Sequence, residues 1–533
     1  MTLSTGGNQY LTHSPAVHIG VGRFARGHWL PIAQQMGLEV TGIQINTPTV
    51  RDELVGQNYD YDLFELTPGM DHTRVTCLRD ILVAQEDRAR VVDVLADPPT
   101  RLVTLTITQQ GYHQIKEHEI ARELTRYPNA GYRKINEPVS AAAFLVAGLQ
   151  ARFFRGIDPF VVMSLDNVRD NGTELRDVVL NYARMLDGGD HGEFATWVEG
   201  VEFIGTMVDR IVPTSVGYDA EQERLLVARG LEHHPHPILT EPMPNPCLVI
   251  GNASTDPIFS HLGNVDGVFV GADVDAYSTM KIRMLNGAHI ALGMVGRLAG
   301  FEFAHEAMQS PVIRLYIEEF LHQMQETLPD IPGIDKQEYA REVVERISNP
   351  LMNDPLWRLA RNSFEKISQR VLDPLQEALD RGLPCEHLAT AAVAWIQYLK
   401  RANNDKSFEI CDETSLKRGL ISLTNDEYDP CVFVNLDSTR EFFPRTAGLS
   451  HGDISHASLM GMAKAASEEL DLILAHAHET EVPQEWFEGA TVRRSSLFDG
   501  ADPSALTSGT LQLWSHEVEP RGIERVAVPS TQS

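Results

Sequence analysis

Hydrophobic residues in the first half of the chain fall into short runs, and longer stretches with helical spacing separate them. Apolar runs with polar ends predict strands, and a helical stretch between successive strands predicts a crossover connection. The predicted strands are 16–19, 39–45, 101–108 and 160–165, and 175–186 is a predicted helix. The alternation continues to about residue 275 and indicates an α/β fold with a doubly wound parallel sheet.

The pattern changes from about Met280 onward, where apolar residues recur at helical spacing. The predicted helices are 311–328, 337–347, 384–399 and 457–478. This indicates a mostly α-helical second domain. The domains that we expect are 1–275, 276–480 and a divergent carboxy-terminal extension, 481–533. The proline-rich stretch 233–246 is expected to be an irregular connection within the first domain.

Composition narrows the class of protein. The chain has 533 residues, 43% hydrophobic and 22% charged, with a formal net charge of −29. Excess negative charge argues against nucleic acid and anionic membranes as partners. The five cysteines contain no Cys-x-x-Cys pair, and the start of the chain has no apolar core of a signal peptide. We therefore expect a cytoplasmic protein without a disulfide framework or a zinc site.

The densest histidine cluster is His233, His234 and His236, beside prolines. It indicates a loop more than a metal site, and no metal is expected in the function.

A glycine-rich turn follows the first predicted strand directly. Gly20 and Gly22 stand between that strand and a helical stretch, which is the context of a phosphate-binding loop in Rossmann-like domains. Gly20 permits a tight turn, and Gly22 lets the backbone approach a pyrophosphate at a helix amino terminus. The third glycine of the common fingerprint is displaced to Gly27, and such turns also occur without a ligand.

Lys281, Asn286 and His289 are polar positions in an otherwise apolar helical run that extends to Val295. At about 100° per residue they fall on one side of a helix, within an arc of about 140°. An amine, an amide and an imidazole would thus face a common point. Burial lowers the pKa of an amine, which suits it to act as a base. The alternative is a buried polar cluster that fixes helix packing.

The spacing of these residues resembles that of the polyol-specific long-chain dehydrogenases, the mannitol dehydrogenase and fructuronate reductase family. Four further segments resemble the family in the same order along residues 16–400. They are the glycine-rich turn 20–28, the Asp-Asn-x-x-x-Asn-Gly segment 166–172, the Val-Asp-Arg-Ile-x-Pro element 208–213 and the segment 354–366.

The resemblance implies a bound dinucleotide. The residues expected to bind it are Gly20, Gly22, Arg23, Phe24, Arg26, Asn46, Thr108 and Asn167. An acidic residue usually ends the second strand of NAD-binding folds. This chain has Asn46 there, and the nearest downstream charge is Arg51, so both NAD and NADP fit the sequence.

The resemblance also assigns roles in catalysis. Lys281 is the expected general base, and Asn171 and Asn286 are expected to stabilise an alkoxide, with His289 orienting a substrate hydroxyl. The expected substrate-binding residues are Asp209, Arg358, Arg361 and Lys366. Arg361 stands where the family has a histidine, which allows a carboxylate or phosphate on the substrate.

The resemblance therefore implies a metal-independent, NAD(P)-dependent oxidoreductase that interconverts a mannitol-type polyol and its ketose. A uronate reductase and a phosphorylated-polyol dehydrogenase are alternatives, and a non-catalytic nucleotide-sensing protein is an alternative of another class. The expected partner is a small polyol, ketose or sugar acid, and the expected assembly is a monomer or a small homo-oligomer.

Overall fold

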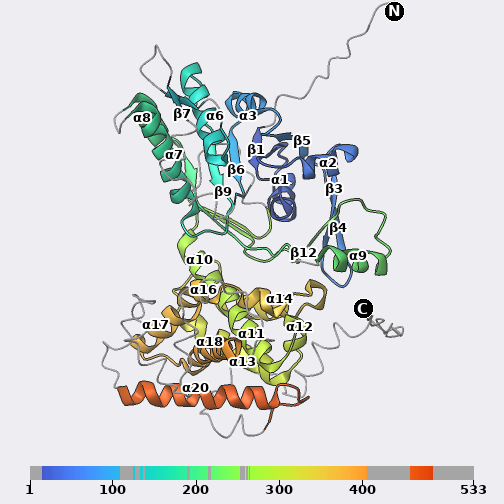
Figure 1. Cartoon of the computed structure of the whole chain (residues 1–533), viewed down its shortest axis with the longest axis vertical. Coiled ribbons are helices and arrows are strands. Elements are labelled where there is room, and N and C mark those ends of the chain that lie inside the picture. Colours follow the sequence, from blue (N-terminus) through green and yellow to red (C-terminus); the bar gives the residue numbers. More distant parts are fainter. Residues whose placement is uncertain are drawn as a thin grey trace, which may run out of the picture.

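The computed structural model places a sheet-containing part beside a helical part, with helix α10 between them (Figure 1). The structure describes residues 15–107, 124–126, 133–135, 138–188, 192–213, 218–251, 259, 262, 265–404, 408 and 456–483. Most of the expected extension 481–533 lies outside this described part.

The main sheet has six strands in the order β10-β9-β6-β1-β2-β5, and every pairing in it is parallel. The strands are β1 (Ala16–Ile19), β2 (Val40–Gln44), β5 (Leu78–Val83), β6 (Leu102–Leu105), β9 (Val161–Ser164) and β10 (Phe203–Ile204). The central strands are buried apolar runs, as parallel strands covered on both faces require. Counted from β5, this is the strand order of a Rossmann fold, so the predicted doubly wound sheet is confirmed.

Helices cover the two faces of this sheet (Figure 1). They are η1 (Ala25–Trp29), α1 (Leu30–Gln35), α2 (Thr49–Leu54), η2 (Val55–Gln57), α3 (Arg88–Ala96), α6 (Ala141–Arg155), α7 (Asn171–Asp187) and α8 (Glu193–Glu199). Helix α6 is buried along most of its length, because it packs against both α3 and α7. Ser140 caps its start with a hydrogen bond to Ala143 N.

Three smaller sheets and one helix complete the first part. One sheet contains β3 (Tyr61–Glu65), β4 (Asp71–Val75) and β12 (Ile238–Thr240), and a second contains β11 (Thr206–Val208), β13 (Leu248–Ile250) and β14 (Val268–Val270). The third sheet pairs β7 (Leu124–Arg126) with β8 (Arg133–Ile135), and the helix is α9 (Tyr218–Ala228). Strand β12 lies inside the stretch 233–246, which was predicted to be irregular. That prediction was wrong because β12 pairs with β3, a partner that is distant in sequence.

The described residues after β14 form helices and no named strand. The helices are α10 (Val274–Arg283), α11 (Leu285–Ala299), α12 (Ala304–Ala307), α13 (Pro311–Glu326), α14 (Lys336–Ser348), η5 (Pro350–Met352), α15 (Leu356–Ala360), α16 (Ser363–Ile367), η6 (Ser368–Leu372), α17 (Asp373–Arg381), α18 (Glu386–Asn404) and α20 (His456–His476). Helix α11 is the centre of this part and packs against α13, α15 and α18. None of the described helices combines the length and the apolar character that crossing a bilayer requires.

Candidate active site

The carboxyl end of β1 lies at the point where the order of the main sheet reverses, because β2 and β6 flank it on opposite sides. Ligands of doubly wound sheets bind at such switch points. Gly20 follows β1 with φ +100°, and a Cβ there would lie 2.2 Å from Thr106 O. At Gly22 the nearest atom to an added Cβ is 3.9 Å away. The predicted turn therefore requires glycine at position 20, where a side chain would clash, whereas the space beside Gly22 is open.

The three side chains after this turn all have protein partners. Arg23 Nη1 donates to Gln222 Oε1 at 2.9 Å, and the Phe24 ring stacks on His28 with centroids 5.0 Å apart. Arg26 is buried, with its guanidinium 3.9 Å from Glu53. These residues shape the start of the helix, and their contact with a cofactor stays a prediction.

Asn46 is exposed just beyond the end of β2. Arg51 forms ion pairs with Asp52 and Glu86, so its positive charge is already neutralised by these carboxylates. The end of the second strand thus offers an accessible amide and no carboxylate of its own. Thr108, the other residue predicted to contact the cofactor from a strand end, lies outside the described residues.

Lys281 lies at the junction of the two parts of the chain. Its Nζ donates to Val208 O at 2.6 Å and to Asn167 Oδ1 at 2.8 Å. Burial lowers the pKa of this ammonium; the nearby Asp209 carboxylate opposes the shift, and Arg346 adds to it. A buried amine with two acceptors has a fixed position and a third proton that can be exchanged.

The polar helix face around Lys281 differs in one respect from the prediction. The run is interrupted at Met284, so Lys281 belongs to α10 while Asn286 and His289 belong to α11. The side-chain amide of Asn286 is half-buried and has no hydrogen-bond partner among the described residues. Burial lowers the pKa of His289 well below its usual value, and the Arg358 guanidinium adds to the effect. The imidazole is therefore neutral near pH 7.

The side-chain amide of Asn171 is bonded to the protein through both its nitrogen and its oxygen. Its Nδ2 donates to Asp166 O at 2.8 Å and to Thr206 O at 3.0 Å, and its Oδ1 accepts from Thr206 N at 2.9 Å. Asn171 is buried and has no donor left for an alkoxide. Asn167, which was predicted to lie beside the cofactor, is exposed and accepts a hydrogen bond from Lys281; its contact with the cofactor stays a prediction.

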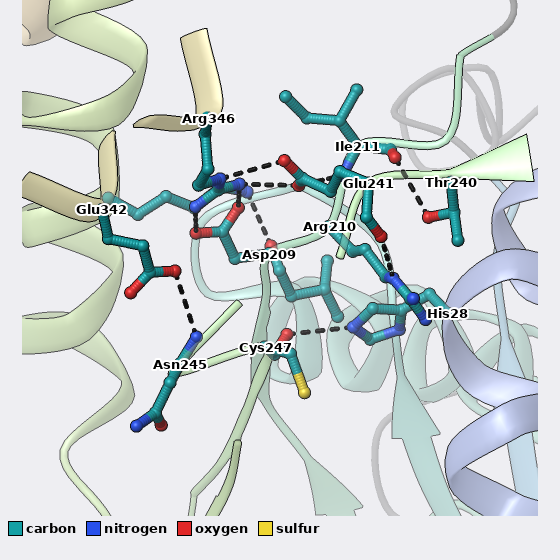
Figure 2. Close-up of polar contacts among 12 residues, drawn as sticks. His28, Asp209, Arg210, Ile211, Thr240, Glu241, Asn245, Cys247, Glu342 and Arg346 are labelled. Atoms are coloured by element: carbon teal, nitrogen blue, oxygen red, sulfur yellow. Dashed lines mark hydrogen bonds and ion pairs between the residues drawn. The ribbon is translucent and has the colours of Figure 1, made fainter. Parts of the chain in front are cut away.

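Asp209, which was predicted to bind substrate, is buried and has protein partners. Arg346 of α14 donates to both of its oxygens, at 2.9 and 2.8 Å (Figure 2). The Tyr339 hydroxyl also donates to Asp209, at 3.2 Å. The Arg346 guanidinium donates to Glu241 as well, at 3.0 and 2.8 Å. Asp209 is consequently held in a buried network between the two parts of the chain, and its contact with a substrate stays a prediction.

Sequence reasoning missed Arg346 and Glu241. A signal for Arg346 was present, because it shares a helix face with the buried residues Tyr339, Val343 and Ile347. A cation on the apolar side of an amphipathic helix indicates a buried partner. Glu241 gave no comparable signal, since it follows a strand that was not predicted.

The remaining predicted substrate residues lie on α15, α16 and the segment between them. Arg358 donates to Asp354, with Nε 2.6 Å from Oδ1. Arg361 is exposed, and Lys366 Nζ donates to its backbone oxygen at 2.7 Å. The effect of Arg358 on the His289 pKa places its charge near His289, whereas no contact of the Arg361 side chain shows that it faces the same point.

Arg370 was not predicted. It lies in the short π-helix η6, its backbone oxygen would be 3.0 Å from a Cβ at Gly287, and burial lowers its pKa to about 10. Its charge also lowers the pKa of Lys281 and of His289. No carboxylate among the described residues pairs with it. Arg370 is thus a further cation near the proposed base.

A Rossmann-ordered sheet with a glycine turn at its switch point, next to a buried amine, defines a nucleotide-dependent oxidoreductase. Two family models match the chain: the mannitol dehydrogenase Rossmann domain over residues 14–243 and the mannitol dehydrogenase C-terminal domain over residues 273–425. The chain therefore belongs to the mannitol dehydrogenase family, as its sequence motifs predicted.

Known relatives agree with this assignment. Mannitol 2-dehydrogenase of Aspergillus fumigatus is 33% identical over 419 residues, which cover 74% of this chain and 80% of that protein. The enzyme of the same name from Emericella nidulans is 33% identical over 401 residues, 72% of this chain and 78% of that protein.

Solved structures extend the similarity. Pseudomonas fluorescens mannitol 2-dehydrogenase, in a ternary complex with NAD and D-mannitol, has a TM-score of 0.66 and 26% identity, covering 87% of this chain and 94% of that one. A D-sorbitol dehydrogenase in substrate-free form has a TM-score of 0.68 at 24% identity, covering 85% and 95%, and supports the fold alone. The predicted α/β domain followed by a helical region is thus confirmed.

Proposed function

We propose that the protein is an NAD(P)-dependent polyol dehydrogenase that interconverts a mannitol-type polyol and its 2-ketose, with Lys281 as general base. The observation that carries the proposal is the Lys281 amine, buried and held between Val208 O and the exposed Asn167 amide. The bound NAD and D-mannitol of the Pseudomonas fluorescens relative support the cofactor and the substrate class.

The residues of the glycine turn fit the cofactor. Gly20 and the open space at Gly22 let backbone amides approach a pyrophosphate, and the helix amino terminus behind them favours an anion. Asn46 would lie at the adenosine ribose and carries no charge to repel a 2′-phosphate, so either NAD or NADP is compatible. When bound, the oxidised cofactor supplies the hydride acceptor for the alcohol.

A side chain of the protein, Lys281, carries out the proton transfer in this proposal. During oxidation, neutral Lys281 takes the proton of the reacting hydroxyl, and during reduction its ammonium returns that proton. The lowered pKa increases the neutral fraction of the amine near pH 7. Lys281 can therefore serve as the acid and the base for proton transfer, and the mechanism that we propose requires no metal ion.

Two amides stabilise the developing alkoxide in this proposal. Asn167 accepts from Lys281 through Oδ1, which orients its Nδ2 as a donor beside the base. Asn286, near the start of the next helix α11, has no competing side-chain partner among the described residues. Preorganised donors of this kind are each worth about 2.7–4 kcal/mol in a transition state. Neutral His289 is assigned to a second substrate hydroxyl, as are Arg358 and Lys366.

A sugar acid is a second candidate substrate. Arg361 presents an exposed guanidinium, and Arg370 lacks a carboxylate partner among the described residues. A substrate carboxylate would supply the missing anion, because guanidinium binds carboxylates in bidentate fashion.

The test is oxidation of NADH and NADPH with fructose, xylulose, fructuronate, tagaturonate and fructose 6-phosphate. We expect turnover of neutral ketoses, and a preference for the charged members would favour the second candidate. Lys281→Ala should lower kcat by orders of magnitude with NADH binding retained, as followed by NADH fluorescence. Unchanged turnover in this variant would refute the assignment of the base.

The two asparagines give a matched comparison. Asn167→Ala should lower kcat with little change in Tm, because Asn167 is exposed. Asn171→Ala should lower Tm, because Asn171 bridges the backbones of residues 166 and 206. The reverse pattern would restore Asn171 to the catalytic role that the sequence first indicated.

A further inference from the structure

A second cluster of chemically active side chains lies on the β3–β4 hairpin. Asp62 and Phe64 of β3 face Arg74 and His72 of β4 across the pair, in register. Alternate residues of a strand share a face, so these four side chains lie on the same side of the hairpin. His234 reaches them from the connection before β12, the strand that pairs with the other edge of β3.

Three metal-ligating side chains meet at this point. Asp62 Oδ1 is 2.8 Å from His72 Nε2, and Asp62 Oδ2 is 3.0 Å from His234 Nδ1. One ligand atom from each of the three residues lies within 4.8 Å of the other two. We propose that Asp62, His72 and His234 form a binding site for a divalent transition metal, with Zn²⁺ as the best match.

The donor set supports this choice of metal. Two imidazole nitrogens and one carboxylate oxygen are ligands that Zn²⁺ prefers, and water completes a tetrahedral site. The side chain of Asp62 is 5% exposed, that of His234 19% and that of His72 43%. The carboxylate therefore lies at the base of the cluster, and the exposed imidazole side leaves an entry path for the ion.

Phe64 fixes both imidazole rings. The His72 ring stacks on it with centroids 4.8 Å apart, and the His234 ring meets its edge at 5.0 Å. Because these contacts orient the rings before an ion arrives, little side-chain entropy remains to be lost on binding. A cluster that only neutralised Asp62 would not need two oriented rings.

Arg74 is the competing cation. Its Nη1 donates to Asp62 Oδ2 at 2.6 Å, while its Nη2 is 3.9 Å from Asp60. A metal ion bound through Oδ1 leaves Arg74 on Oδ2, or displaces it toward Asp60. In either case the guanidinium opposes the ion by repulsion, so Arg74 sets an upper limit on the affinity.

A bound metal ion would stabilise the connection before β12, which lines a cavity in the sheet-containing part of the protein. The connection that carries His234 continues into His236 and Pro237, which line a cavity of about 380 Å³ together with Arg23 and Arg26. The metal would tie this connection to the hairpin. Zinc binding at this site does not depend on the dehydrogenase activity.

The experiment is calorimetric titration of ZnCl₂ into the full-length, chelator-treated protein. We expect one equivalent to bind at micromolar zinc. His72→Ala and His234→Ala should each weaken binding about tenfold or more. His236→Ala, an exposed histidine on the same connection, is the matched control and should leave it unchanged. Absence of binding, or an affinity for zinc in both ligand variants that equals that of the unmodified protein, would overturn the proposal.

Arg74→Met provides a test that does not depend on loss of a ligand. Removing the competing cation should tighten zinc binding, whereas a cluster with a purely structural role would give no gain. An affinity that is unchanged or weaker, in a variant with a retained circular dichroism spectrum, would contradict the proposed site.

Discussion

The network of Arg346, Asp209 and Glu241 allows a quantitative prediction for Arg346→Met. Arg346 makes four hydrogen bonds to the two carboxylates, and the three side chains are 7%, 2% and 1% exposed. Removing one partner of a buried ion pair costs about 3–5 kcal/mol, because the remaining charge stays buried without compensation. Here two carboxylates would remain, so we expect the upper part of this range.

The assay is thermal unfolding at several pH values. A loss of 3–5 kcal/mol corresponds to about 6–20 °C in Tm for a domain of the size of the helical part. Without Arg346, burial raises the pKa of both acids, so the variant binds protons as it folds. Its stability should therefore recover as the pH falls from 8 to 5, since protonation removes the buried charge.

Arg341→Met is the matched control, because Arg341 is exposed on the same helix. It should change stability by no more than about 0.5 kcal/mol. A loss below about 1 kcal/mol for Arg346→Met, or a loss that is the same at pH 5 and pH 8, would refute the reasoning from buried charge.

Arg370→Met removes a positive charge near Lys281, so the pKa of Lys281 rises and the pH profile of polyol oxidation should move to higher pH. Gly20→Ala should cost at least about 1–2 kcal/mol, because φ is +100°, whereas Gly22→Ala should leave Tm unchanged and weaken NADH binding. Burial raises the pKa of Glu342 to about 7, so folding loses stability as the pH rises through 7, and Glu342→Gln should lessen that loss in Tm.

Each of these predictions has a control. Arg341→Met should leave the pH profile of oxidation in place, and a profile that Arg370→Met does not move would contradict its effect on the base. Equal Tm values for the two glycine variants would contradict the clash at Gly20. Glu345→Gln, exposed on the same helix as Glu342, should keep the pH dependence of the unmodified protein.

The parallel sheet could be predicted because its strands are continuous apolar runs. Strands β1, β2, β6 and β9 lie within one or a few residues of their predicted bounds. The β3–β4 hairpin and β12 were missed, since β4 is exposed over most of its length and carries no apolar alternation. Exposed strands are stabilised by pairing with a partner, and the sequence pattern of one segment does not reveal that partner.

The two asparagines show a different limit. Spacing places Asn167 and Asn171 in one motif, but which amide is free depends on packing. A Cβ at Gly172 would lie 2.5 Å from Gly205 N, so the start of α7 is pressed against the segment before β11. Asn171 is buried there and bonds to Thr206, while Asn167 stays in the preceding turn. Only the tertiary contact decides between them.

The meeting of these charges around Lys281 could not be predicted from the sequence, because they come from three distant segments. Asp209 and Glu241 belong to the sheet-containing part, and Arg346 belongs to the helical part (Figure 2). Protonated Lys281 lies near the Asp209 and Glu241 carboxylates, so loss of its proton leaves these two buried charges with less compensation. Because Arg346 joins the two parts, the protonation of the proposed base is energetically linked to the contact between them.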